Sequence, residues 1–135
     1  MAIQFSAAVR NAMLDGIETA IGVNAILKIR TNAVPANTSA ADAGTVLANI
    51  ALGSDWLANA ANGAKAKNGT WQDTAADANG TAGHWRVYAN DGTTCHIQGN
   101  CTNTGGGGEM TLDNVSIAVN QTVTVTGFTL TAGNA

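Results

Sequence analysis

The chain has 135 residues, and its 6 Lys and Arg against 9 Asp and Glu give a formal net charge of −3 at pH 7. Because so few basic residues cannot form a cationic stripe, we expect no nucleic-acid partner. No apolar run is long enough to cross a membrane, so we expect no membrane partner. With only 3 Trp, 2 Phe and 1 Tyr, each large ring should contribute much of the core. The length predicts a single domain over residues 1–135, and the N-terminus shows no secretion-signal pattern.

The N-terminal segment, residues 1–22, predicts the one helix, with Ser6 as its N-cap and Gly22 as its stop. Apolar residues recur every four positions at Val9, Met13, Ile17 and Ile21. A helix of about four turns is marginal alone, so it should dock on another surface. Two interpretations stay open: the stripe docks on the chain's own sheet, or Val9, Met13 and Ile17 bind a partner protein.

The remainder, residues 23–135, predicts short strands separated by turns. Strands are expected at 25–31, 45–52, 70–72, 110–112, 115–119 and 122–131, and a hairpin at 81–99. Segment 55–69 is expected to be a surface loop pinned by Trp56. Near the C-terminus, Val125 and Phe128 have opposite parity, so Gly127 should form a bulge that keeps both inward.

The predicted hairpin turns at Asn90-Asp91-Gly92, between two alternating runs. A three-residue loop pairs Val87 with Cys95 and Trp85 with Ile97. The inner face then carries Trp85, Val87, Ala89, Cys95 and Ile97, and the solvated outer face carries His84, Arg86, Tyr88, Thr94, His96 and Gln98. In the strand at 25–31, Lys28 and Arg30 likewise form a charged outer face.

Short strands joined by turns are typical of a β-sandwich or jelly roll. The predicted fold is therefore mainly β, an antiparallel β-sandwich or jelly roll with one N-terminal α-helix. Cys95 and Cys101 could close a small loop, but the inward position of Cys95 favours a free thiol. Whether the two cysteines pair stays open.

No pattern in the chain predicts catalysis. His84 and His96 lie on the outer face with Arg86 beside them, which is a poor site for a cation, so no metal and no cofactor are expected. Cys95 and His96 are adjacent strand residues that point to opposite faces, so they do not form a nucleophile and base. The glycines at 105–108 precede Glu109 and a strand, which indicates a flexible loop and no phosphate cradle. We expect no enzyme.

Four segments carry a resemblance to a known group of proteins. They are FSAAVRNAMLDGIETAIG, DWLANAANGAKAKNGTW, GTAGHWRVYANDGTTCHIQG and LDNVSIAVNQTVTVTGFTLTAGNA. Their style and order resemble small virion proteins of tailed bacteriophages, which include capsid decoration or cement proteins with jelly-roll folds. The resemblance implies a dimer or trimer that is made in the bacterial host cytoplasm and binds the major capsid protein on the outer capsid surface. It implies no particular functional residue.

Two other functions remain open from the sequence. A tail or fibre-associated module that recognises a cell-surface glycan would need Trp56, Trp71 and Tyr88 to present flat faces to solvent. A host-encoded cytosolic β-protein is the third possibility.

Overall fold

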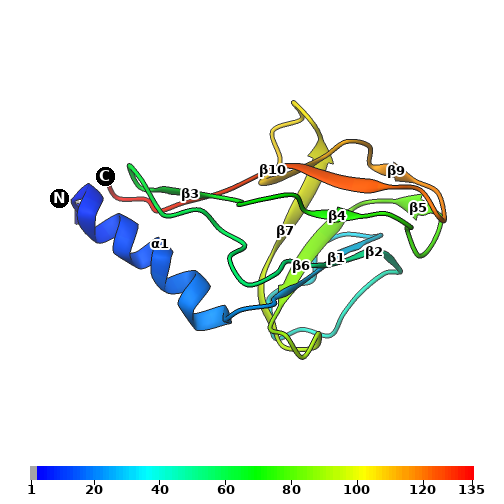
Figure 1. The fold of residues 1–135 in the computed structure, drawn as a ribbon, viewed down its shortest axis with the longest axis horizontal. Coiled ribbons are helices and arrows are strands. Elements are labelled where there is room, and N and C mark those ends of the chain that lie inside the picture. Colours follow the sequence, from blue (N-terminus) through cyan, green and yellow to red (C-terminus); the bar gives the residue numbers. More distant parts are fainter. Residues whose placement is uncertain (1–2) are drawn as a thin grey trace.

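The computed structural model describes residues 3–135, which form one helix and ten strands (Figure 1). The helix is α1 (Ala7–Ile21). The strands are β1 (Ile26–Arg30), β2 (Val46–Ala51), β3 (Ala64–Ala66), β4 (Gln72–Asp73), β5 (Gly80–Thr81), β6 (His84–Tyr88), β7 (Cys95–Asn103), β8 (Met110–Leu112), β9 (Ser116–Ile117) and β10 (Val123–Thr131). The predicted class, mainly β with one N-terminal helix, is confirmed.

The main sheet is mixed and curled, with the order β2-β1-β6-β7-β8-β10-β3 and with β4 paired to β10. Curling brings β4 back towards β2, where the Asn49 backbone N–H donates to Asp73 Oδ2 at 3.0 Å. β5 and β9 form a separate pair. In Figure 1 α1 projects from one end of the sheet, and β3 and the end of β10 run out beside it. The residues just before α1 and the C-terminus lie together at the tip of this projection, where the Phe5 N–H donates to the Asn134 carbonyl at 2.6 Å.

The expectation of a purely antiparallel arrangement is wrong at one place. β7 and β8 are parallel, with Cys101 opposite Met110. Parallel neighbours normally need a long crossover, but here the chain returns through the glycine-rich loop. Gly105 and Gly107 have φ of +85° and +83°, a backbone conformation that glycine adopts without strain. The glycine run is therefore the tight return that makes this pairing possible.

The core is built around aromatic rings, as their scarcity predicted. The ring centroids of Trp56 and Trp71 lie 6.1 Å apart, and Phe128 lies 5.3 Å from Trp71. Trp85 meets Phe128 edge to face at 5.1 Å. All four rings are buried, and such pairs add to the stabilisation from burial.

Local sequence signals are confirmed in two elements. Ser6 caps α1 by accepting a hydrogen bond from the Val9 N–H at 3.3 Å, and Gly22, with φ of +92°, ends it. In β10 the register shifts between Val125 and Gly127, so a bulge keeps Phe128 buried. The strands predicted at 25–31 and 45–52 are present as β1 and β2. The expected loop at 55–69 has Trp56 buried and also contains β3.

The predicted hairpin register is wrong. Val87 lies opposite Ile97, and Trp85 lies opposite Gly99. Asp91 Oδ1 accepts hydrogen bonds from the N–H groups of Thr93 and Thr94, both at 2.9 Å. This Asx turn lengthens the loop beyond three residues, and an irregularity between Val87 and Tyr88 completes the shift.

The predicted solvated outer face of β6 is also wrong, because all five residues of β6 are buried. We call residues 32–45 the strap; this segment crosses the outer face, and Arg86 donates to the backbone carbonyls of Thr38 at 2.9 Å and Ala40 at 3.2 Å. The same strap buries Arg30. Cys95, expected in the core, pairs with Tyr88 in the ladder and lines a cavity beneath the strap. Both cysteines are free thiols.

Candidate functional site

Helix α1 is fastened to the molecule by its polar side. Asn11 Oδ1 accepts from the Gly63 N–H at 2.8 Å. Asp15 Oδ1 accepts from the Ala60 N–H at 3.0 Å, and Glu18 Oε1 accepts from the Leu57 N–H at 3.2 Å. Residues 11, 15 and 18 share one helix face, so the polar residues outside the apolar stripe are turned towards the protein.

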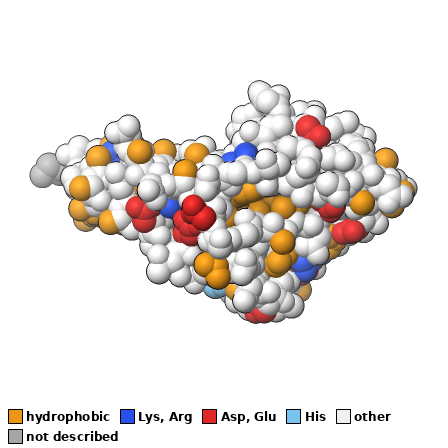
Figure 2. Space-filling view, viewed as in Figure 1, with side chains coloured by type: hydrophobic (Ala, Val, Ile, Leu, Met, Phe, Trp, Pro, Cys, Tyr) orange, Lys and Arg blue, Asp and Glu red, His pale blue; other side chains and the backbone are white. Residues whose placement is uncertain are grey.

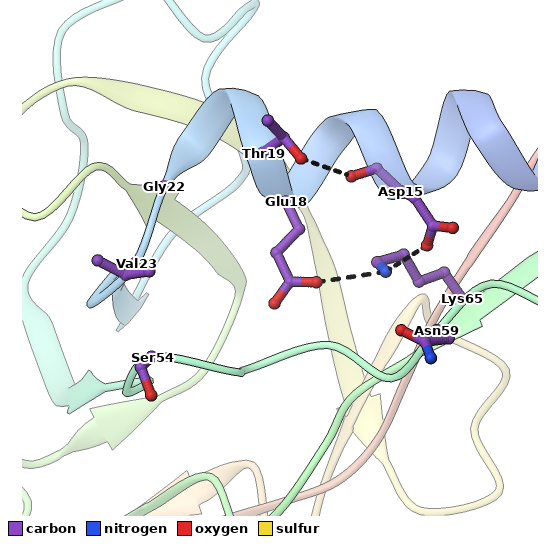
Figure 3. Close-up of a pocket in the computed structure, with 8 residues that line it drawn as sticks. All are labelled: Asp15, Glu18, Thr19, Gly22, Val23, Ser54, Asn59 and Lys65. Atoms are coloured by element: carbon purple, nitrogen blue, oxygen red, sulfur yellow. Dashed lines mark hydrogen bonds and ion pairs between the residues drawn. The ribbon is translucent and has the colours of Figure 1, made fainter.

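Lys65 of β3 is the centre of this attachment (Figure 3). Its Nζ lies 2.7 Å from Asp15 Oδ1, 3.3 Å from Glu18 Oε2 and 2.9 Å from the Ala58 carbonyl. Burial by itself lowers the pKa of Lys65, but the hydrogen bonds and charges of the two carboxylates outweigh it and raise that pKa. The hydrogen bond from Lys65 lowers the pKa of Asp15. Both groups are therefore charged at neutral pH, and the cluster is an ion pair that positions the helix.

A hollow of about 470 Å³ opens beside this ion pair, lined by both ends of it and by Thr19, Val23, Ser54 and Asn59. In Figure 3 Lys65 points between the two carboxylates, and Ser54 lies apart from them. All three N–H donors of the ammonium have acceptors within 3.3 Å. The Lys65 ammonium and the two carboxylates are therefore engaged with one another, and this contact positions the helix.

The apolar stripe of α1 is covered only towards the C-terminal end of the helix. Ile21 is buried, Ile17 is half-buried, and Met13 and Val9 are 51% and 45% exposed. β3 packs beneath the middle of the helix, where Leu14 is buried, and leaves one flank uncovered. Figure 2 shows hydrophobic side chains along the projecting helix, with acidic side chains gathered beside them. Exposed large apolar side chains in such a row are a candidate interaction surface.

The stripe leads into a groove between the helix and the sheet. The groove has a volume of about 290 Å³ and is lined by Ile17, Ala20, Ile21, His96, Ile97 and Leu130. We call the stripe Val9, Met13 and Ile17 together with this groove the α1 surface. The other exposed helix positions beside the stripe are small, at Ala8, Ala12 and Gly16. A partner that covers the α1 surface would therefore remove no charged group at these three positions from water.

The structure brings the three predicted residues Val9, Met13 and Ile17 onto one face; their binding of a partner stays a prediction. Sequence reasoning missed the contribution of His96, Ile97 and Leu130 to this surface. No local signal could have found them, because β7 and β10 meet the helix only through the tertiary fold.

The two histidines lie in different surroundings. His84 is fully buried with Nδ1 2.9 Å from the Asn32 carbonyl oxygen, whereas His96 is exposed in the groove. Within residues 3–135 no three or more His, Cys, Asp or Glu side chains gather where a metal ion could be held. The same range contains no helix that is long and apolar enough to span a membrane.

No family model, no curated protein and no solved structure matches this chain. The candidate site therefore rests on the residues and geometry described above.

Proposed function

We propose that this protein is a structural virion protein of the capsid decoration (cement) type, which binds the outer capsid surface and stabilises the shell. The observation that supports it is the orientation of α1: polar side chains attach the helix, and the N-terminal half of its apolar stripe, Val9 and Met13, is left outward. A helix placed this way contributes little to its own fold through Val9 and Met13. A partner surface gives those side chains a role.

The size of the helix indicates what kind of partner fits. A helix of 15 residues is about 22 Å long and about 10 Å wide, so one face offers roughly 220 Å². A stable interface needs about 800 Å² on each partner. The α1 face alone is too small, so we propose that the groove and inter-strand loops add contacts and that the protein binds as a dimer or trimer. Several weak contacts held together bind far more tightly than one.

The mechanism is mass action. A protein that binds the assembled lattice of the major capsid protein, and not its free subunits, shifts the equilibrium towards the lattice. No covalent step and no cofactor enter this mechanism. We also propose the jelly-roll architecture that the resemblance implies. The curled sheet supports it. The parallel β7–β8 pair departs from the all-antiparallel arrangement of a jelly roll.

The glycan-binding alternative requires exposed aromatic rings. Trp56, Trp71 and Tyr88 are all buried, so none presents a flat ring to a sugar. We therefore propose no second function.

The first experiment asks whether the α1 surface binds shells. The double variant Val9→Thr/Met13→Gln replaces both exposed apolar side chains by polar ones of similar size. The control variant Ala8→Thr/Ala12→Gln places the same two side chains at neighbouring exposed positions. Surface changes of this kind alter the free energy of unfolding by about 0.5 kcal/mol or less, so both variants should fold.

The assay is co-sedimentation with capsids purified from a lysate of bacteria that carry the encoding genome, with bound protein quantified by mass spectrometry. We expect the unmodified protein and the control variant to sediment with the capsids and the stripe variant to remain in solution. Equal sedimentation of all three would refute the assignment of the α1 surface. Absence of the unmodified protein from purified particles would refute the function itself.

A further inference from the structure

Beneath the strap lies a buried cluster with unbalanced charge. The side chains of Arg30 and Arg86 are 10% and 2% exposed. Asp42 is the one carboxylate that pairs with them in residues 3–135: its Oδ2 lies 2.8 Å from Arg30 Nη2, and its Oδ1 accepts from Arg86 Nη1. Two guanidinium groups and one carboxylate leave a net charge of about +1 in this cluster. Removing such a charge from water is costly unless it is compensated.

The donors of this cluster are not all used. Arg86 also donates to the carbonyls of Asn37, Thr38 and Ala40, whose dipoles offset part of the charge. The Nε atoms of Arg30 and Arg86 are buried, with no hydrogen-bond partner in the described part of the chain. Buried donors normally have partners, and an exception calls for a cause such as an ion that completes the site.

A cavity adjoins this cluster. It has a volume of about 390 Å³ and lies between the strap at 38–42 and residues 93–95, which are the end of the β6–β7 loop and the start of β7, with Arg86 in its wall. Thr38, Ser39, Thr93, Thr94 and Cys95 line it, and of these the Thr94 hydroxyl already donates to Asp91 Oδ2. One water occupies about 30 Å³ of liquid, so the cavity has room for a small hydrated ion. Asp42 also lines it, but its oxygens already accept from Arg30, Arg86 and the Tyr88 hydroxyl.

We propose that this cavity binds a small inorganic oxyanion of the phosphate or sulfate class. Arg86 and Arg30 supply the attracting positive charge, and hydroxyl groups from both the strap and the loop donate hydrogen bonds to its oxygens. A tetrahedral oxyanion accepts hydrogen bonds from several sides at once, which suits donors that lie on two facing segments. The anion neutralises the cluster and ties the strap to the sheet. This site is distinct from the α1 surface and does not depend on the proposed function.

Cys95 provides the test, because it lines the cavity whereas Cys101 is buried in the core. The rate of Cys95 alkylation by iodoacetamide is measured by mass spectrometry in the full chain, with sodium phosphate or sodium sulfate added. Sodium chloride keeps the ionic strength constant. A bound anion should slow alkylation by the factor one plus the ratio of anion concentration to its dissociation constant, about elevenfold at ten times that constant. Cys101 should stay unmodified throughout.

A variant separates the site from a general salt effect. Ser39→Ala/Thr93→Val removes two hydroxyl groups from the cavity wall without touching the arginines. Ser54→Ala/Thr70→Val makes the same changes at exposed positions outside this cavity. We expect the first variant to need a higher phosphate concentration for the same protection and the control to behave as the unmodified protein.

Three results would overturn the proposal. They are an alkylation rate that phosphate and sulfate leave unchanged, equal protection by chloride at the same ionic strength, and full protection of Ser39→Ala/Thr93→Val. Circular dichroism of each variant before alkylation establishes that it is folded. Protection by phosphate but not sulfate, or the reverse, would identify which oxyanion the cavity prefers.

Discussion

Asp42→Asn tests how the strap is held. The Asp42 carboxylate accepts hydrogen bonds from Arg30 at 2.8 Å, from the Tyr88 hydroxyl at 2.6 Å and from Arg86. An amide carries no charge and offers one acceptor oxygen, so the substitution leaves two buried guanidinium groups without a counter-charge. Breaking a fully buried ion pair in this way costs about 3–5 kcal/mol.

For Asp42→Asn we expect a smaller loss of unfolding free energy, because the Asp42 side chain is 38% exposed and solvent screens part of the interaction. We expect the free energy of unfolding to fall by about 2 kcal/mol after this discount. For a domain of this size urea lowers the free energy of unfolding by about 2 kcal/mol per molar. The urea midpoint should therefore fall by about 1 M at pH 7.

The pH dependence gives a second test of the same contact. Burial by itself raises the pKa of Asp42, but hydrogen bonds from Tyr88 and Arg86 and the two arginine charges outweigh it and lower that pKa. Because the pKa of Asp42 is lower in the folded state, its ionisation stabilises the fold at pH values above the unfolded-state pKa of about 3.9. This stabilisation is lost as the pH falls through the folded-state pKa. The difference between the unmodified protein and Asp42→Asn should therefore shrink below about pH 4.

The assay is urea unfolding followed by tryptophan fluorescence at several pH values. Asp77→Asn is the control, because it removes the same charge from an exposed residue, and its midpoint should stay unchanged. If Asp42→Asn shifts the urea midpoint at pH 7 no more than the control does, the Asp42 carboxylate does not hold the strap. A difference that stays constant down to low pH would also contradict this role of the carboxylate.

Two further predictions concern the core. Phe128→Ala removes the ring that lies 5.3 Å from Trp71 and 5.1 Å from Trp85, so the free energy of unfolding should fall by about 4 kcal/mol in urea titration. A loss below about 1 kcal/mol, typical of a surface position, would contradict that packing. Burial raises the pKa of Cys101 to about 11, so in the folded protein a thiol-reactive chromophore should react with Cys95 and reach Cys101 only on unfolding. Equal reaction rates for the two thiols would show that Cys101 is accessible.

The sequence by itself determined the elements whose causes are local. The hydroxyl of Ser6 lies within one turn of the N–H that it caps, and Gly22 ends the helix through its own backbone angles. The change of parity after Val125 requires one extra residue if Val125 and Phe128 are to face the same side of the strand. The bulge at Gly127 was therefore predictable without knowing the neighbouring strands. In each case the interacting groups are a few residues apart in the chain.

Only the tertiary structure decided which face of each element is covered. Alternation in β6 indicates two faces, but the partner that buries Arg86 is Asp42, 44 residues earlier in the chain. The periodicity of α1 indicates a stripe, but the polar side turns inward because the backbone N–H groups of Ala60 and Gly63 donate to Asp15 and Asn11. A sequence pattern shows that the two faces of a strand or helix differ, but it does not show which segment covers each face. Which face is buried therefore depends on where segments distant in the chain fold.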